Sequence, residues 1–480
     1  MIGGSHMLKN IIPIPKEIEE LEGVIDLPLS VCADACFEPY IKALIDSFEK
    51  MFGKRLSLGE GIRLAFDGSL AECAYRIDST DGVTLYASAP EGLYYAMASL
   101  LLWVNKGSLT LERAKIFDYP DKPHRALFVD LARAWHPART VHQYIELCFI
   151  LKARYLHLHF MDDHGYTLPS RKFPRVTDGY RHYSFEEIDA MVIHARERGI
   201  IIIPEFEVPG HASVLIKNYP EVFGNTEKNG KKTFTVDGKE VSGGNIICAG
   251  SERSFSAVKD ILSEVCEMFP DSPYIHIGGD EAKIKVWGEC SECLDYMKKK
   301  GIEDVYELYS EFVGRVADHV ISLGRVPMVW EGFPEKGIKH IPKETVVMVW
   351  DNGYHSADRL VEEGFRIINT AWKPLYIVPD FDRRWGIFDI LSWNVCQWQH
   401  FSKNSPLYDK PLEIAPTDSL LGAQLCAWES TFEEEIGRTT DCLFAFSERL
   451  WNECFKSDEE DFAKRTLKTI WNVSRFIQDV

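Results

Sequence analysis

The hydrophobic positions of this chain change their pattern near Pro120. Beyond it, short runs of apolar and β-branched residues alternate with longer stretches whose apolar residues recur at helical spacing. Eight runs are predicted as strands, at residues 126–131, 155–160, 200–206, 274–277, 326–330, 345–350, 365–369 and 421–427. Helices are predicted between most of them, at residues 141–153, 185–198, 255–268, 305–323 and 357–363. Strands that alternate with helices form a parallel sheet, and eight of them predict a closed (β/α)8 barrel, the TIM barrel.

The residues before Pro120 follow a less regular pattern. Residues 75–77 and 83–87 have the side chains of short strands, whereas residues 91–104 form a helical stretch with apolar side chains on more than one side. The pattern predicts a small α+β domain over residues 8–118. We expect this domain to pack against the barrel and to carry no chemistry of its own.

The barrel domain is predicted to occupy residues 119–480, and its last part, residues 438–480, is predicted to be helical. Two connections between predicted strands are long. Residues 217–250 have the pattern of a polar hairpin insertion, and the aromatic-rich residues 376–419 are predicted to form a rim or lid over one end of the barrel. Residues 1–7 include the run GSHM and are interpreted as a vector-derived tag remnant.

Charge and cysteine content narrow the function classes. The net charge of −19 over 480 residues disfavours nucleic acid and anionic membranes as partners, because both require basic patches. No apolar run reaches the roughly 18 residues of a membrane-spanning helix. Twelve cysteines without regular spacing predict reduced thiols and a cytoplasmic location, although a removed signal peptide would leave secretion open. Cys290 and Cys293 form a single CxxC pair, which is interpreted as structural thiols rather than a zinc or redox site.

Acidic and aromatic residues follow the predicted barrel strands. In such a barrel the carboxyl ends of the strands meet at one mouth, where active sites form. The run YIHIGGDE, residues 274–281, delivers the adjacent Asp280 and Glu281 after two glycines that permit a tight turn. The other strand ends carry Asp130, Arg133, Asp162, Asp163, Glu205 to His211, Trp330, Glu331, Trp350, Asp351, Trp372, Tyr376, Trp428 and Glu429. Tryptophan faces beside charged groups are typical of a carbohydrate pocket.

Several motifs occur in an order that resembles one enzyme family. They are a GLYYAMASLL helix, VDLAR, an H-x-H-x-x-D-D run, PEFEVPGH and HIGGDE. With these motifs the chain resembles the β-N-acetylhexosaminidases of glycoside hydrolase family 20 over nearly its whole length. The resemblance implies an exo-acting, retaining enzyme without cofactor or metal, whose substrate is a glycan with a terminal β-linked GalNAc or GlcNAc. The substrate's own 2-acetamido oxygen is the nucleophile, an exception to the usual two-carboxylate scheme.

The resemblance also implies roles for individual residues. Glu281 would be the general acid and base, and Asp280 would orient the acetamido group and stabilise the oxazolinium intermediate. Tyr376 would hydrogen-bond the acetamido oxygen, and Asp162 with His211 would form a relay to Glu281. The sugar would be bound by Arg133, Trp330, Trp350, Trp372, Trp428 and Glu429.

The chain departs from the family pattern at three positions. Val378 stands where the Tyr-Leu-Asp run has Asp, and Ser430 stands where the Trp-x-Glu run has Glu, with Glu429 one residue early. Glu207 replaces a common Asp in the PEFEVPGH run. Because the first two carboxylates normally bind hydroxyls at C4 and C6, we expect GalNAc to be accepted at least as well as GlcNAc.

Three alternative functions are compatible with the same residues. A metal-dependent TIM-barrel hydrolase would use the histidines and acids His157, His159, Asp162, Asp163, His211 and His276. A non-catalytic carbohydrate-binding protein would keep the pocket and lose the chemistry. A third possibility is a glycosidase in which Asp280 attacks sugars that lack the acetamido group.

Overall fold

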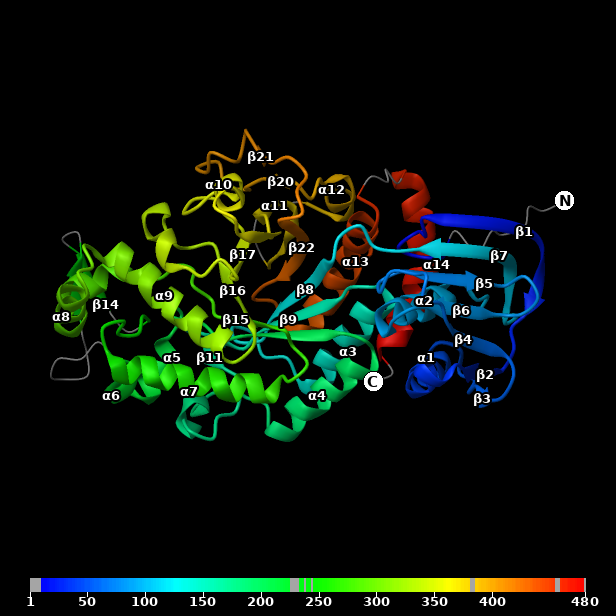
Figure 1. Ribbon diagram of the computed structural model, residues 1–480, viewed down its shortest axis with the longest axis horizontal. Helices are drawn as coiled ribbons and strands as arrows, with labels where there is room; N and C mark the ends of the chain where they lie inside the picture. The colour runs from blue at the N-terminus through cyan, green and yellow to red at the C-terminus, as the bar shows by residue number, and fades with distance from the viewer. Residues whose placement is uncertain are drawn as a thin grey trace.

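The structure is a computed structural model that describes residues 10–224, 233–236, 239–242, 245–379, 385–453 and 458–478. Figure 1 shows a β/α barrel at one end of the molecule and a smaller sheet with its helices at the other. The predicted tag remnant at residues 1–7 lies outside the described residues.

Eight parallel strands of the described chain close into a barrel, which confirms the predicted fold class. They are β8 His124–Asp130, β9 Tyr155–His159, β12 Ile201–Glu205, β15 Tyr274–His276, β16 Val326–Trp330, β17 Val346–Val349, β18 Arg366–Asn369 and β22 Leu420–Ala427. Each strand pairs with the next in this order, and β22 pairs with both β18 and β8 to complete the circle. The short strand β19, Tyr376–Ile377, adds to β22 at Cys426 and Ala427.

The strands form here because their apolar runs are buried on both faces. All seven residues of β8 and all four of β17 are buried, as is typical of parallel strands that have side chains inside and helices outside. The barrel interior contains Phe128, Ile203, Met328 and Ile368. The outward-facing residues join a separate, larger core beneath the helices.

The main barrel helices are α3 Ala138–Ile150, α4 Phe185–Glu197, α7 Glu252–Met268, α9 Val305–Ser322, α10 Ala357–Glu362 and α13 Phe432–Trp451. All five helices predicted between strands are present, with shifts of up to three residues at their starts. Side-chain hydrogen bonds determine where two of these helices begin. Ser184 and Glu187 form a capping box at the start of α4, and the side chain of Asp304 caps the start of α9.

Smaller elements occupy the connections. They are β10 Met161–Asp162, β11 Gly165–Tyr166, η3 Pro174–Thr177, α5 Ser213–Asn218, α6 Pro220–Phe223, β13 Thr233–Val236, β14 Lys239–Ser242, η4 Ile284–Glu289, α8 Ser291–Lys300, η5 Glu335–His340, α11 Trp372–Leu375, α12 Ile387–Ser392, β20 Gln397–Trp398 and β21 Leu412–Glu413. The antiparallel pairing of β13 with β14 confirms the predicted hairpin insertion. Helix α8 was not predicted.

Seven described strands form the N-terminal sheet, in the order β1-β7-β5-β6-β4-β2-β3. They are β1 Glu17–Asp26, β2 Ser30–Ala33, β3 Ser57–Leu58, β4 Ile62–Phe66, β5 Tyr75–Asp78, β6 Thr84–Ala87 and β7 Thr110–Asp118, accompanied by η2 Ala35–Tyr40, α1 Ile41–Phe52 and α2 Pro90–Trp103. Residues 92–103 of α2 are all buried, since this helix packs against both the sheet and α3. The last helix, α14 Glu459–Gln478, runs between the barrel and this sheet (Figure 1).

A buried ion pair joins the sheet to the barrel. The Nζ of Lys152, in the loop after α3, lies 3.2 Å from Asp118 Oδ2 and 2.8 Å from the hydroxyl of Tyr75. All three side chains are at most 1% exposed.

No described helix is both long and apolar enough to cross a membrane.

Candidate active site

A pocket opens at the carboxyl ends of the barrel strands. It encloses about 180 Å³, which is below the roughly 300–1,000 Å³ of pockets for drug-sized ligands and suits a single sugar ring. Its lining residues are Arg133, Asp280, Glu281, Trp330, Trp350, Trp372, Tyr376, Val378, Trp428 and Glu429. The structure therefore brings nine of the predicted site residues together, and the other two, Asp162 and His211, lie next to the acidic pair.

The backbone after β15 aims the acidic pair into the pocket. Gly278 and Gly279 have φ values of +71° and +100°, which favour glycine. Glu281 also has a positive φ, of +45°, a conformation that a residue with a side chain adopts only where the surrounding structure enforces it. As a result, carboxylate oxygens of Asp280 and Glu281 and a ring nitrogen of His211 lie within 4.8 Å of one another.

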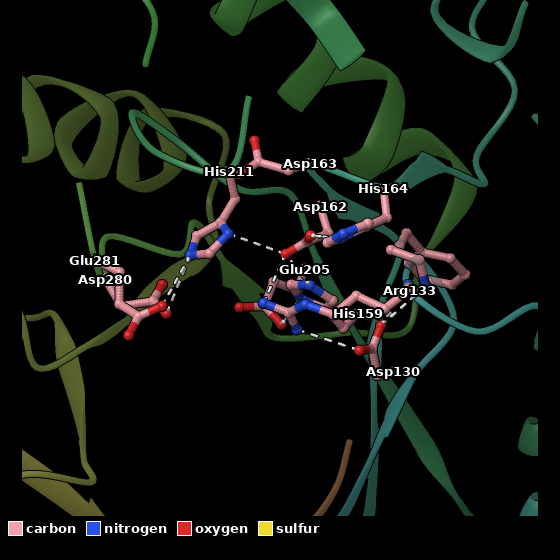
Figure 2. A network of polar contacts seen from close by, with 12 residues as sticks. Asp130, Arg133, His159, Asp162, Asp163, His164, Glu205, His211, Asp280 and Glu281 are labelled. Carbon is pink, nitrogen blue, oxygen red and sulfur yellow. Dashed lines mark hydrogen bonds and ion pairs between the residues drawn. The ribbon is translucent and has the colours of Figure 1, made fainter. Parts of the chain in front are cut away.

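His211 lies between the acidic pair and a third carboxylate, that of Asp162 (Figure 2). Its Nε2 is 3.7 Å from Asp280 Oδ2 and 3.8 Å from Glu281 Oε2, while its Nδ1 is 3.0 Å from Asp162 Oδ2. Arg133 Nη2 approaches the same Asp162 oxygen at 2.8 Å. Arg133, Asp162, His211 and the acidic pair thus form a continuous series of opposite charges.

This series shifts the pKa values of its members. Burial lowers the pKa of His211, but the contact with Asp162 and the charge of Asp280 outweigh it and raise the pKa to about 9. Burial would raise the pKa of Asp162, yet its histidine neighbours and Arg133 hold that pKa well below its usual value. Burial and then the charge of Asp280 raise the pKa of Glu281. A raised pKa keeps Glu281 protonated at higher pH, as a general acid requires.

Aromatic rings form a continuous wall around the pocket. The ring centroids of Trp330 and Trp428 are 5.9 Å apart, and that of Tyr376 lies 6.0 Å from Trp428 and 4.2 Å from Trp372. Trp350 extends the wall, with its centroid 6.0 Å from that of Trp372. Such a wall can stack on the apolar face of a sugar or enclose an acetyl methyl group.

The first two departures from the family pattern concern side chains in or next to the pocket. Val378 lines the pocket with an apolar side chain. Glu429 also lines it, with φ of +60° and Oε1 3.9 Å from Arg133 Nε. Ser430 is buried, and its hydroxyl hydrogen-bonds the carbonyl oxygen of Trp428 at 3.5 Å. Glu429 is therefore the acid that this strand end presents to the pocket.

Glu207, the third departure, is buried beside the acidic pair. Burial and then the charge of Asp280 raise the pKa of Glu207 well above its usual value, which favours the neutral acid. Asp163 has a different position from its neighbour Asp162. It accepts hydrogen bonds from the backbone N–H and hydroxyl of Ser213 and so fixes the start of α5.

Glu205 forms a buried centre beneath the pocket, a role that the sequence did not assign to it. Its carboxylate accepts a hydrogen bond of 2.6 Å from the indole of Trp330. It also lies 2.8 Å from His276, 2.7 Å from His159 and 3.3 Å from His157. These contacts give each histidine of the H-x-H run a carboxylate partner, so the spacing requires no metal to explain it. An acid within the apolar strand IIIPE was the signal that could have revealed this centre.

Glu331 is a second residue that the sequence left without a role. Its carboxylate accepts backbone N–H groups of the loop after β17, from Asp351, Asn352, Tyr354 and His355. Its carbonyl accepts the indole N–H of Trp350 at 2.8 Å. Glu331 therefore holds both this loop and one aromatic ring of the pocket.

Two family models match the chain. "Glycosyl hydrolase family 20, catalytic domain" covers residues 123–454, and "Glycosyl hydrolase family 20, domain 2" covers residues 8–119. A β-hexosaminidase of Porphyromonas gingivalis is 26% identical over 95% of this chain, and the chain spans 62% of that protein's length. The human β-hexosaminidase subunit beta is 26% identical over 74% of this chain and 61% of its own.

Solved structures share the fold. An exo-β-N-acetylglucosaminidase of Vibrio harveyi has a TM-score of 0.82 at 21% identity, covering 99% of this chain and 78% of that one. A β-N-acetylhexosaminidase of Bacteroides fragilis has a TM-score of 0.80 at 23% identity, covering 97% and 96%. Because the catalytic-domain model matches well over half of the sequence, this chain belongs to glycoside hydrolase family 20.

Proposed function

We propose that this chain is an exo-acting, retaining β-N-acetylhexosaminidase that releases a terminal β-linked N-acetylhexosamine from a glycan. The observation that carries the proposal is the adjacent pair Asp280 and Glu281, directed by the turn after β15 into a pocket of one-ring size with aromatic walls. Family membership and the names of the relatives support the same activity.

Glu281 acts as the general acid in the first step and as the general base in the second. It protonates the glycosidic oxygen as the bond to the anomeric carbon breaks, and it later takes a proton from the attacking water. Its side chain is 58% exposed, so that both the leaving group and water can reach it. Its raised pKa supports the acid role.

Asp280 and Tyr376 position the nucleophile. The acetamido oxygen of the substrate attacks the anomeric carbon and forms an oxazolinium ion, while Asp280 accepts the acetamido N–H and offsets the positive charge. The hydroxyl of Tyr376 donates to the acetamido oxygen. One carboxylate oxygen of Asp280 and one of Glu281 lie within 4.8 Å of each other, so that both groups can reach the same sugar ring.

His211 and Asp162 hold this pair in place. A positively charged His211, paired with Asp162, lies near both carboxylates and limits their mutual repulsion. Arg133 contacts Asp162 as His211 does, and it binds sugar hydroxyls. The sugar ring and its acetyl group are enclosed by Trp330, Trp350, Trp372 and Trp428.

The stereochemistry of the product tests this function. Proton NMR during hydrolysis of p-nitrophenyl β-N-acetylhexosaminides should show the β-anomer first, and a thiazoline mimic of the oxazolinium should inhibit strongly. The matching glucoside and galactoside, which lack the acetamido group, should not be hydrolysed. An inverted product, a stable ester on Asp280 or turnover of plain glucosides would contradict the proposal.

Two further proposals concern the domain division and the cellular location of the protein. We propose that residues 8–118 and 119–480 form two domains, a division supported by the separate family matches to residues 8–119 and 123–454. The cytoplasmic location rests on the cysteine pattern and stays a prediction.

A further inference from the structure

Three cysteine thiols converge outside the pocket. Cys248 Sγ lies 3.7 Å from Cys290 Sγ and 3.7 Å from Cys293 Sγ, and all three sulfur atoms lie within 4.8 Å of one another. All three side chains are at most 2% exposed. The sequence showed only the CxxC pair, because Cys248 is 42 residues away from Cys290 along the chain.

The fold brings the thiols together from two loops. Cys248 follows the β13–β14 hairpin in the connection from β12 to α7, whereas Cys290 is the N-cap residue of α8 and Cys293 lies in its first turn. The loops are closely packed here, since a Cβ on Gly250 would overlap with the backbone of residues 292–293. The indole of Trp287 also donates to the carbonyl of Ile247 at 2.9 Å.

The spacing fits a tetrahedral metal better than a disulfide. A disulfide requires an S–S distance of about 2.05 Å. Sulfur atoms at about 2.3 Å from a tetrahedral zinc ion lie roughly 3.8 Å apart, which is close to both measured distances. Three buried sulfur donors prefer a soft or borderline metal to a hard one.

A fourth donor is available at the edge of the cluster. Glu292 Oε2 lies 3.4 Å from Cys248 Sγ, and its side chain is partly exposed. We propose that Cys248, Cys290 and Cys293 bind one structural zinc ion, with the carboxylate of Glu292 or a water molecule as the fourth ligand. Binding displaces the three thiol protons to solvent.

This site would connect the two loops that carry the active-site charges. The segment before Cys248 is hydrogen-bonded to the neighbours of His211: Ala212 N–H donates to Asn245 O at 3.1 Å, and Ile247 N–H donates to Pro209 O at 3.0 Å. Cys290 follows Asp280 and Glu281 in the next loop. A zinc ion would therefore fix the distance between His211 and the acidic pair without touching either.

Metal content of the full-length protein tests the proposal. The protein is produced in zinc-supplemented medium, purified with a reducing agent, and analysed by inductively coupled plasma mass spectrometry. We expect about one zinc per chain, lost in Cys248→Ser and Cys293→Ser and retained in Cys266→Ser, a change of a buried cysteine outside the cluster. Glu292→Gln should keep the zinc but release it faster to a chelating dye.

A second measurement uses the wild-type protein, so that the test does not depend on variants that fail to fold. Cobalt(II) added to metal-free wild-type protein should give thiolate charge-transfer and tetrahedral d–d absorption bands, which one equivalent of zinc abolishes. A wild-type protein with under about 0.1 zinc per chain and no such bands would overturn the proposal. A disulfide between Cys248 and either partner in the reduced preparation, detected by mass spectrometry, would also overturn it.

Discussion

The carboxyl group of Glu207 lies against the backbone of Gly278, so closely that a Cβ on this glycine would overlap with it. Gly278 opens the turn that delivers the acidic pair, and its φ is +71°. Conformation and close approach thus both require glycine at this position, and the side chain of Glu207 supports the turn from below.

Gly278→Ala should therefore reduce kcat/KM by about 100-fold or more, because a shift of roughly 1 Å in a catalytic group has an effect of this size. Gly324→Ala is a matched control, since Gly324 has φ of +74° and no atom within 4 Å of its would-be Cβ. Both variants should lose about 1–3 kcal/mol of unfolding free energy from backbone strain. Equal activity in the two variants would refute the role of the Glu207 contact.

Glu281→Gln should lower kcat by about 10²–10⁴-fold on substrates with poor leaving groups, because the amide cannot transfer a proton. An activated leaving group needs less protonation, so the loss in the first step should be smaller for a dinitrophenyl glycoside. Added azide should restore part of the turnover by replacing the water that Glu281 activates. Near wild-type turnover of a substrate with a poor leaving group would show that Glu281 is not the acid.

The raised pKa of His211, about 9 against an ordinary 6.5, predicts a pH-dependent contribution to stability. A raised pKa stabilises the protonated folded state, so this contribution is complete below pH 6.5 and disappears as the pH rises through about 9. Chemical unfolding at several pH values should show that His211→Asn costs much more stability at pH 6 than at pH 9.5.

His142 is the control for this experiment. Burial and the neighbouring His194 lower its pKa to about 4, so that His142 is neutral in both states above pH 6.5. The cost of His142→Asn should stay constant between pH 7 and 9.5. A cost of His211→Asn that is equally constant over this range would argue against a charged His211.

The side chains of Val378 and Glu429 lead us to expect weak discrimination between GalNAc and GlcNAc substrates. A buried carboxylate opposite the C4 hydroxyl would disfavour the wrong epimer by about 1–3 kcal/mol, and Val378 removes one such group. We expect kcat/KM for the GalNAc substrate to equal or exceed that for the GlcNAc substrate. Val378→Asp should restore discrimination at C4, whereas Val378→Ile, which adds no charge, should not.

Glu429 can be tested separately, because it lines the pocket and lies near Arg133. Glu429→Gln should change the ratio of the two kcat/KM values, and Glu433→Gln, a change of an exposed acid on α13, should leave it unaltered. A wild-type preference for the gluco sugar above about tenfold, roughly 1.4 kcal/mol, would contradict the prediction of a weak choice.

The barrel could be predicted because each strand is a local apolar run, and the motif order placed Asp280, Glu281 and Arg133 at one mouth. The acid within the apolar strand IIIPE indicates that Glu205 needs buried partners, but the identity of those partners could not be predicted, since they come from separate strands and meet only when the barrel closes. Helix α8 was missed because lysines and acids dominate it, although Cys293, Tyr296 and Met297 share the helical spacing of a buried face. The thiol cluster likewise depends on two loops whose approach no local pattern encodes.

The ion pair between Lys152 and Asp118 makes the two parts of the molecule depend on each other for stability. Lys152 belongs to the barrel and Asp118 to the last strand of the N-terminal sheet, and burial lowers the pKa of the lysine despite its partner. Replacing Asp118 with alanine would leave the charge of Lys152 buried without its counterion, at a cost of about 3–5 kcal/mol, a large share of the roughly 5–15 kcal/mol that hold a typical protein folded. Heating should therefore melt both parts in a single cooperative transition.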